Sequence, residues 1–75
     1  MSIPTVYINA SSKKALNERI AKGHEIAGDQ FTMSGSHLVY LHEMPAGTVV
    51  KIYEKFVGGN PYAKAYGNWN GKKVI

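Results

Sequence analysis

The stretch that decides the fold is "TVVKIYEKFVGGNPYAKAYGNW", residues 48–69, in which two strand-like segments flank a short break. Residues 48–57 are rich in β-branched and aromatic side chains, which favour a β-strand. The break, "GGNP" at 58–61, is typical of a turn. Residues 62–69 are then expected to return as a second strand. The sequence therefore predicts an antiparallel β-hairpin across this stretch.

The two faces of this hairpin follow from its register. We expect the break to act as a four-residue loop, so that Val57 faces Tyr62. Because side chains alternate across a strand, the residues then divide between two faces. The predicted core face holds Val50, Ile52, Phe56, Ala63, Gly67 and Trp69, extended by Val74. The other face holds the predicted binding residues Lys51, Tyr53, Lys55, Tyr62, Lys64 and Tyr66, with Lys73 nearby. A one-residue slip would exchange the faces.

The second face is chemically unusual. In the expected register Lys55 opposes Lys64 and Tyr53 opposes Tyr66, with no carboxylate on the face. A sheet face with rings for stacking and cations for phosphate is typical of several single-stranded nucleic-acid binders. A tyrosine-rich patch is also typical of protein interfaces. Tyrosine also favours strands for packing alone, and lysines keep a solvent-facing sheet soluble.

The first third of the chain predicts a strand and a helix. "TVYINA" (5–10) alternates and is rich in β-branched and aromatic residues, which indicates a first strand. A serine at position 11 or 12 can cap a helix over 13–22, whose apolar residues share one face. Gly23 is well placed to end this helix in a left-handed conformation.

The middle and the end of the chain complete the expected sheet. "HEIAGDQFT" (24–32) is compatible with an irregular strand, a loop or an extension of the helix. "HLVYLH" (37–42) predicts a buried or half-buried strand. Asn70-Gly71 is a dipeptide that favours a type I′ turn, so a terminal strand is expected over 72–75. Further turns are expected at 33–36 and 43–47.

These elements predict the fold class. One N-terminal helix packed on a mostly antiparallel sheet of about four to six short strands makes an α+β domain. Seventy-five residues are close to the smallest chain that folds without disulfides or metals, so we expect one small domain over residues 1–75. The hydrophobic fraction of 44% is ordinary for a globular protein and too high for disorder.

The charge is unevenly distributed. Residues 1–43 carry four basic and four acidic groups, whereas residues 44–75 carry five lysines against Glu54 alone, which accounts for the net charge of +4. Concentrated positive charge steers anionic partners, so the predicted partner is an acidic protein or a nucleic acid. We expect a monomer, or a homodimer formed by pairing an edge strand.

Composition also bears on location. The longest apolar run, residues 38–41, is too short to span a bilayer, so no membrane partner is expected. Residues 1–10 do not have the pattern of a signal peptide. The chain contains no cysteine, which favours a reducing compartment. A cytoplasmic location is therefore expected.

Signatures of catalysis and metal binding are not found in the sequence. His37 and His42 are five residues apart and face opposite sides of a regular strand, and "HE" at 42–43 lacks the second histidine of a helical zinc site. "MSGSH" (33–37) has serines and a histidine but is ordinary turn chemistry. No cofactor, no metal and no enzymatic activity are expected.

The predicted function is that of a small non-enzymatic binding protein. It is expected to engage an acidic macromolecular partner through the basic, tyrosine-bearing C-terminal hairpin. Domains of this size and charge are common as protein-interaction or inhibitor modules among phage and mobile-element accessory proteins, an association that rests on class alone. The alternative is a single-stranded RNA- or DNA-binding protein.

Overall fold

The computed structural model describes residues 3–75, apart from the side chains of residues 32 and 60. The elements, in chain order, are β1 (Thr5–Asn9), α1 (Lys13–Ala21), β2 (Ala27–Thr32), β3 (Gly35–Tyr40), a 3₁₀ turn η1 (Leu41–Glu43), β4 (Val49–Val57) and β5 (Asn60–Asn68). One helix precedes four of five strands in a mostly antiparallel sheet, so the predicted α+β fold is confirmed. Residues 1–2 of the predicted domain lie outside the described residues.

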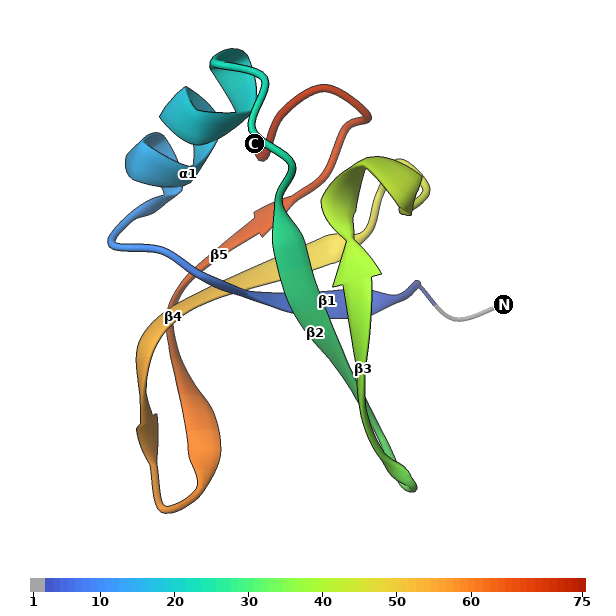
Figure 1. Ribbon diagram of the computed structural model, residues 1–75, viewed down its shortest axis with the longest axis vertical. Coiled ribbons are helices and arrows are strands. Elements are labelled where there is room, and N and C mark those ends of the chain that lie inside the picture. The colour runs from blue at the N-terminus through green and yellow to red at the C-terminus, as the bar shows by residue number, and fades with distance from the viewer. Residues whose placement is uncertain (1–2) are drawn as a thin grey trace.

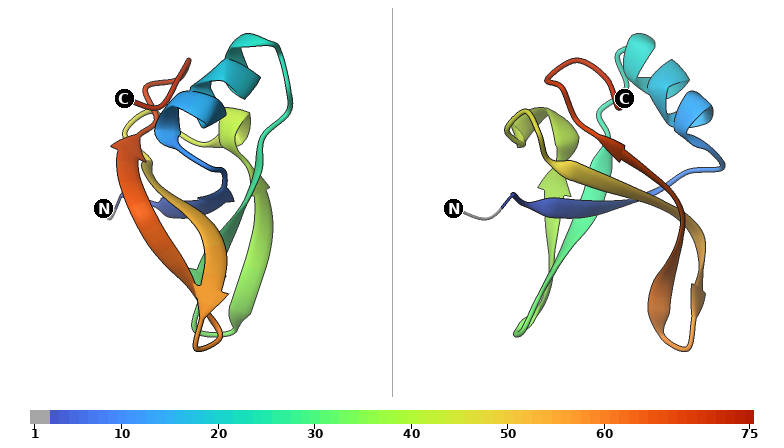
Figure 2. Two further views of the ribbon diagram at one scale, coloured as in Figure 1. Left: turned by 90° about the vertical axis from the view of Figure 1, so that its left-hand side faces the viewer. Right: turned by 180° about the vertical axis from the view of Figure 1, so that it is seen from behind.

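The sheet is built around the first strand. Its order is β3-β2-β1-β4-β5, with β1 parallel to β4 and every other neighbouring pair antiparallel. Figure 1 shows α1, η1 and the end of the chain gathered at one end of the molecule, while the turns of the β2–β3 and β4–β5 hairpins project toward the other. Figure 2 shows the same division from two further sides.

One face of the sheet is buried and the other is uncovered. Along β1 the side chains of Val6 and Ile8 are fully buried and Tyr7 between them is only half-buried. Val50 and Ile52 of β4 repeat this period of two, which is the pattern of a sheet covered on one side. We call the uncovered side the open face, defined by Tyr7, Asp29, Phe31, Lys51, Tyr53 and Tyr66.

The covered face packs under α1 and the C-terminal residues. The helix contributes Leu16 and Ile20, and the largest fully buried side chain is Trp69. The predicted cap is formed by Ser12, whose Oγ accepts a hydrogen bond from the Ala15 amide at 3.0 Å. Helix α1 ends before Gly23, as predicted, so the extension through residues 24–27 is wrong.

Residues 24–32, which the sequence left ambiguous, contain β2. Its central Gly28 is buried against β1, where an added Cβ would lie 2.9 Å from the Tyr7 carbonyl oxygen. Glycine and aspartate have low strand propensity, so the local sequence alone does not favour a strand here. Residues 27–32 form one because they pair with both β1 and β3. The neighbouring strand β3 ends at Tyr40, two residues before the predicted end, because Leu41 and His42 enter η1.

The predicted four-residue hairpin loop is wrong. Val57 pairs with Asn60, which leaves a two-residue loop of Gly58 and Gly59. Both glycines have positive φ, +62° and +84°, which is the requirement of a type I′ turn. The register therefore differs by two residues, so Val50 lies opposite Gly67. A shift of two preserves the alternation of side chains, and the predicted core positions of Val50, Ile52, Gly67, Trp69 and Val74 are confirmed.

Two irregularities in the hairpin correct the remaining core positions. The register changes on either side of Tyr53, which pairs with Ala63. Ala63 therefore shares the side of Tyr53 instead of the core side. Phe56 is 54% exposed, because α1 and the C-terminal residues cover the half of β4 near Val50 and the hairpin extends beyond them. The Phe56 ring lies 5.5 Å from the Tyr53 ring instead.

The end of the chain forms a turn of a different type from the one predicted. Among the described residues only glycines have positive φ, so Asn70-Gly71 is not a type I′ turn. The Asn70 Oδ1 accepts hydrogen bonds from the amides of Lys72 and Lys73, each at 2.8 Å. The predicted terminal strand reduces to the bridge between Trp69 and Val74, followed by backbone hydrogen bonds between residues 68 and 75. We call residues 70–73 the C-terminal turn.

Candidate binding surfaces

The structure divides the predicted binding residues among three places. Lys51, Tyr53 and Tyr66 lie together on the open face. Lys55, Tyr62 and Lys64 line a small hollow on the outer part of the hairpin. Lys73 lies apart from both sets, beside the helix. The predicted single basic face is therefore wrong, because bulges and the C-terminal turn redistribute its lysines.

A lysine held between two tyrosine rings marks the centre of the open face. Lys51 pairs with Tyr7 of β1 on one side and with Tyr66 of β5 on the other. Its Nζ lies 5.3 Å from the Tyr7 ring centroid and 5.8 Å from that of Tyr66, and donates a 3.4 Å hydrogen bond to the Tyr7 Oη. Each cation–π contact is worth about 0.5–2 kcal/mol, depending on desolvation. The ammonium is thus held between the two rings.

One further ring, that of Phe31, extends this site, and neither Phe31 nor Tyr7 was among the predicted binding residues. Phe31 of β2 meets the Tyr7 ring edge-on, with centroids 5.0 Å apart, and is 44% exposed. Tyr66 at the other end is 58% exposed. The rings therefore cross from β2 to β5 over the open face. The alternation of side chains in residues 5–10 was the available signal for Tyr7, because it places Tyr7 on the face away from Val6 and Ile8. Phe31 lies in the segment 24–32, whose structure the sequence left ambiguous.

The open face also contains a carboxylate, which comes from β2 and not from the hairpin. Asp29 of β2 pairs with Tyr7, and its Oδ2 accepts a long hydrogen bond of 3.5 Å from the Tyr53 hydroxyl. Burial raises the pKa of Tyr53 above its ordinary value, and the charge of Asp29 and this hydrogen bond raise it further. Lys51 and Asp29 together leave the face close to neutral.

Tyr53→Phe is expected to reduce the loss of stability at alkaline pH. Because the pKa of Tyr53 is raised in the folded protein, the unfolded chain releases this proton first as the pH rises. The stabilisation that the protonated Tyr53 hydroxyl gives to the folded state is fully present below about pH 10, the ordinary pKa of tyrosine. It is lost as the pH rises through the higher pKa of Tyr53 in the folded protein. Urea unfolding midpoints from about pH 8 to pH 11 should fall less steeply for the variant. Identical slopes would contradict the assignment.

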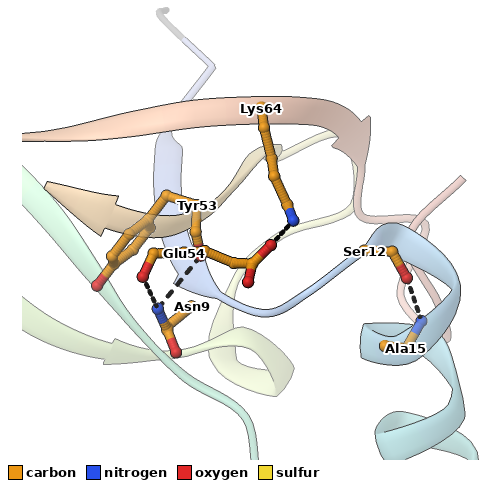
Figure 3. A network of polar contacts seen from close by, with 6 residues as sticks. All are labelled: Asn9, Ser12, Ala15, Tyr53, Glu54 and Lys64. Carbon is orange, nitrogen blue, oxygen red and sulfur yellow. Dashed lines mark hydrogen bonds and ion pairs between the residues drawn. The ribbon is translucent and has the colours of Figure 1, made fainter. Parts of the chain in front are cut away.

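The hollow on the outer hairpin is built by the bulges. Lys64 forms an ion pair with Glu54 (Figure 3), so the predicted opposition of Lys55 and Lys64 is wrong. The bulge places a carboxylate beside Lys64, which avoids the cost of opposed like charges. The Asn9 amide holds the bulged strand by donating to the carbonyls of Tyr53 and Glu54, at 3.2 and 3.4 Å. The hollow measures about 270 Å³.

The third place lies between α1 and the C-terminal turn. Lys73 lines a larger hollow of about 680 Å³ there, together with Lys13, Lys14 and Lys72. Four of the eight lysines in the sequence therefore gather where the sequence analysis placed only one binding residue. The sequence shows only two separate lysine pairs, at 13–14 and 72–73. Their proximity cannot be predicted without the position of the C-terminal turn relative to the helix.

Across residues 3–75 no cluster of three or more His, Asp and Glu side chains is arranged to hold a metal ion. No helix in this part of the chain is both long enough and apolar enough to cross a membrane. Comparison of the chain with known protein families, with curated proteins and with solved structures found no match.

Proposed function

We propose that the protein is a non-enzymatic binding protein that engages an acidic partner protein through the open face. The β4–β5 hairpin supplies Lys51, Tyr53 and Tyr66 to this interface, and β1 and β2 supply Tyr7 and Phe31. The observation that carries the proposal is the Lys51 ammonium held between the rings of Tyr7 and Tyr66. The proposal keeps the interaction or inhibitor role and the cytoplasmic location expected from the sequence.

The exposed rings support a protein partner. Interface centres are enriched in aromatic residues, and a few such anchors contribute most of the binding energy. Tyr66 and Phe31 expose ring surface at the two ends of the open face, and Leu38 of β3, paired with Asp29, is 64% exposed. Large apolar surface of this kind on a small domain is typical of an interaction site.

The charge of the hairpin supports an acidic partner. Lys51 and Lys55 have no carboxylate within ion-pair distance among the described residues, whereas Lys64 is paired with Glu54. Asp29 offsets Lys51 on the open face itself, but the β4–β5 hairpin carries three lysines against Glu54 alone. This excess of positive charge raises the rate of association with an acidic surface and selects against basic partners. A partner carboxylate that reaches Lys51 would meet a cation already positioned by two rings, so little side-chain entropy would be lost.

Two tyrosines with the same exposure make a matched test. Tyr66 on the open face and Tyr62 on the outer hairpin are each 58% exposed, but only Tyr66 contacts the Lys51 cation in the described structure. Tyr66→Ala is expected to weaken partner binding at least about tenfold, equivalent to ~1.4 kcal/mol, whereas Tyr62→Ala should change it far less. Quantitative affinity capture from lysate with and without nuclease treatment, followed by binding measurements with the captured protein, compares the three forms.

Two results would overturn this assignment. Equal capture of the partner by wild type and both variants would remove the open face as the interface. Capture that disappears on nuclease treatment would favour the single-stranded nucleic-acid alternative, in which the exposed rings stack on bases.

A further inference from the structure

The strongest concentration of positive charge in the described structure is not on the open face. It surrounds the hollow of about 680 Å³ between α1 and the C-terminal turn, which we call the lysine groove. It is lined by Lys13 and Lys14 from the helix and by Lys72 and Lys73 from the turn, together with the apolar residues Ile20 and Ala21. Among the residues that line it, Glu18 is the one carboxylate.

The fold holds the two sides of the lysine groove together. The Asn17 side chain donates to the Val74 carbonyl at 2.7 Å and accepts from the Val74 amide at 2.8 Å. This paired contact fixes the end of the chain to the helix immediately after Lys72 and Lys73. Within the turn, Asn70 binds the amides of both lysines. The four ammonium groups are therefore carried on backbone that is fixed from both sides.

The four lysines of the lysine groove are electrostatically unfavourable in the absence of a bound anion. Four positive side chains around one hollow repel one another, and a single carboxylate cannot neutralise them. Lys13 and Lys14 also stand in the first turn of α1, where the helix dipole disfavours cations by a few tenths of a kcal/mol. A bound anion relieves both costs.

The type of cation indicates the type of anion. Protein interfaces are anchored by aromatic residues and arginine and are depleted in lysine. The residues that line the lysine groove include four lysines but neither an aromatic side chain nor an arginine. Lysine binds phosphate as a flexible point charge, without the planar fork that arginine offers to carboxylates and phosphates alike. This composition fits a chain of phosphates better than it fits an acidic protein surface.

The dimensions agree with a phosphate chain. Helix α1 has nine residues, so at ~1.5 Å per residue the helix side of the groove is about 13 Å long. Phosphates follow one another at about 3.4 Å of rise along each strand of a duplex, so several fit along this length. We propose that the lysine groove binds the sugar–phosphate backbone of nucleic acid, independently of base sequence. This site is additional to the proposed protein interface and lies on the helix side of the sheet.

Two variants that remove the same charge from different places test this proposal. Lys14→Ala/Lys73→Ala neutralises two exposed lysines of the lysine groove, and Lys55→Ala/Lys64→Ala neutralises two on the outer hairpin. All four positions are exposed, so both variants should fold, which circular dichroism checks. Fluorescence anisotropy with labelled oligo(dT), and with the corresponding duplex, measures affinity for each protein at several salt concentrations.

The expected result is quantitative. With one phosphate per lysine and ~0.7 counterions released per contact on a single strand, wild-type affinity should fall about 50-fold between about 50 and 200 mM salt. The groove variant should bind less tightly at low salt, and its affinity should fall only about 7-fold over the same range. The hairpin variant should keep the wild-type affinity and salt dependence.

Other outcomes overturn the proposal. Equal losses of affinity in the two variants would show that the nucleic acid is attracted by net charge alone. A loss of affinity confined to the hairpin variant would place the nucleic-acid contact on the outer hairpin. No binding to either oligonucleotide at low salt would exclude a nucleic-acid backbone as the ligand. Poly-glutamate that competes as well as oligo(dT), at equal charge, would show a carboxylate site instead of a phosphate site.

Discussion

Trp69→Ala is expected to leave the protein largely unfolded near room temperature. Trp69 is 1% exposed, and its indole is the largest fully buried side chain in the described structure. Replacing a buried aromatic residue by alanine costs about 3–5 kcal/mol, and a chain of this length has a total stability of about 4–11 kcal/mol. A small domain lies toward the lower end of that range, because it buries a small fraction of its surface.

Far-UV circular dichroism and the dispersion of amide NMR signals measure this loss directly. Trp69→Phe is the control, since it keeps a ring in the same cavity and preserves the edge-on contact with His42, whose ring lies 5.4 Å away. The control should remain folded with reduced stability. A Trp69→Ala protein that unfolds cooperatively, within about 1 kcal/mol of the wild type, would show that the core closes without this residue.

Gly67→Ala should produce the second largest effect, although it adds only one methyl group. Gly67 is buried in β5, and a Cβ there would overlap the Val74 side chain and lie 2.9 Å from the Ile75 carbonyl oxygen. Overpacking of this kind costs about 1–3 kcal/mol. The strain falls on backbone as well as on a side chain, so simple rotamer changes cannot relieve it. Urea unfolding followed by Trp69 fluorescence measures the difference.

A double-mutant cycle identifies the cause of that loss. Val74→Ala alone creates a cavity beneath the C-terminal turn and should also destabilise the protein. In Gly67→Ala/Val74→Ala the added methyl group occupies part of the space that Val74 vacates, so the combined loss should be smaller than the sum of the single losses by about 0.5–3 kcal/mol. Additive losses of stability would mean that the added methyl group at position 67 clashes with atoms other than the Val74 side chain.

The elements that the sequence predicted well are those in which local signals agree. Helix α1 has a capping serine, a consistent apolar face and a terminal glycine, and the structure gives it nearly the predicted bounds. Strand β4 combines high strand propensity with alternation. In strand β2 the local signals do not agree. Gly28 has low strand propensity, and its lack of a side chain allows β1 to approach closely.

The candidate site was predicted less well, for a physical reason. Side-chain neighbours in a hairpin depend on the loop and on bulges, and a Gly-Gly loop in place of a four-residue loop changed every cross-strand pair. The face of Lys51 and Tyr66 survived, because the register moved by an even number of residues. The association of Lys73 with α1 depends on the Asn17–Val74 contact, which joins residues 57 positions apart and leaves no local pattern.

The central position of β1 has a consequence for how fast the protein folds. Each half of the sheet beyond β1 is a hairpin whose strands are joined by a short turn, and such units form within microseconds. Strand β1 must then pair in parallel with β4, which brings together residues 44 positions apart, such as Thr5 and Val49. The entropy of closing that long loop is lost before most of the stabilising contacts exist. The docking of β1 between two preformed hairpins is therefore expected to limit the rate of folding, and changes at the β1–β4 boundary should slow folding more than changes at either hairpin tip.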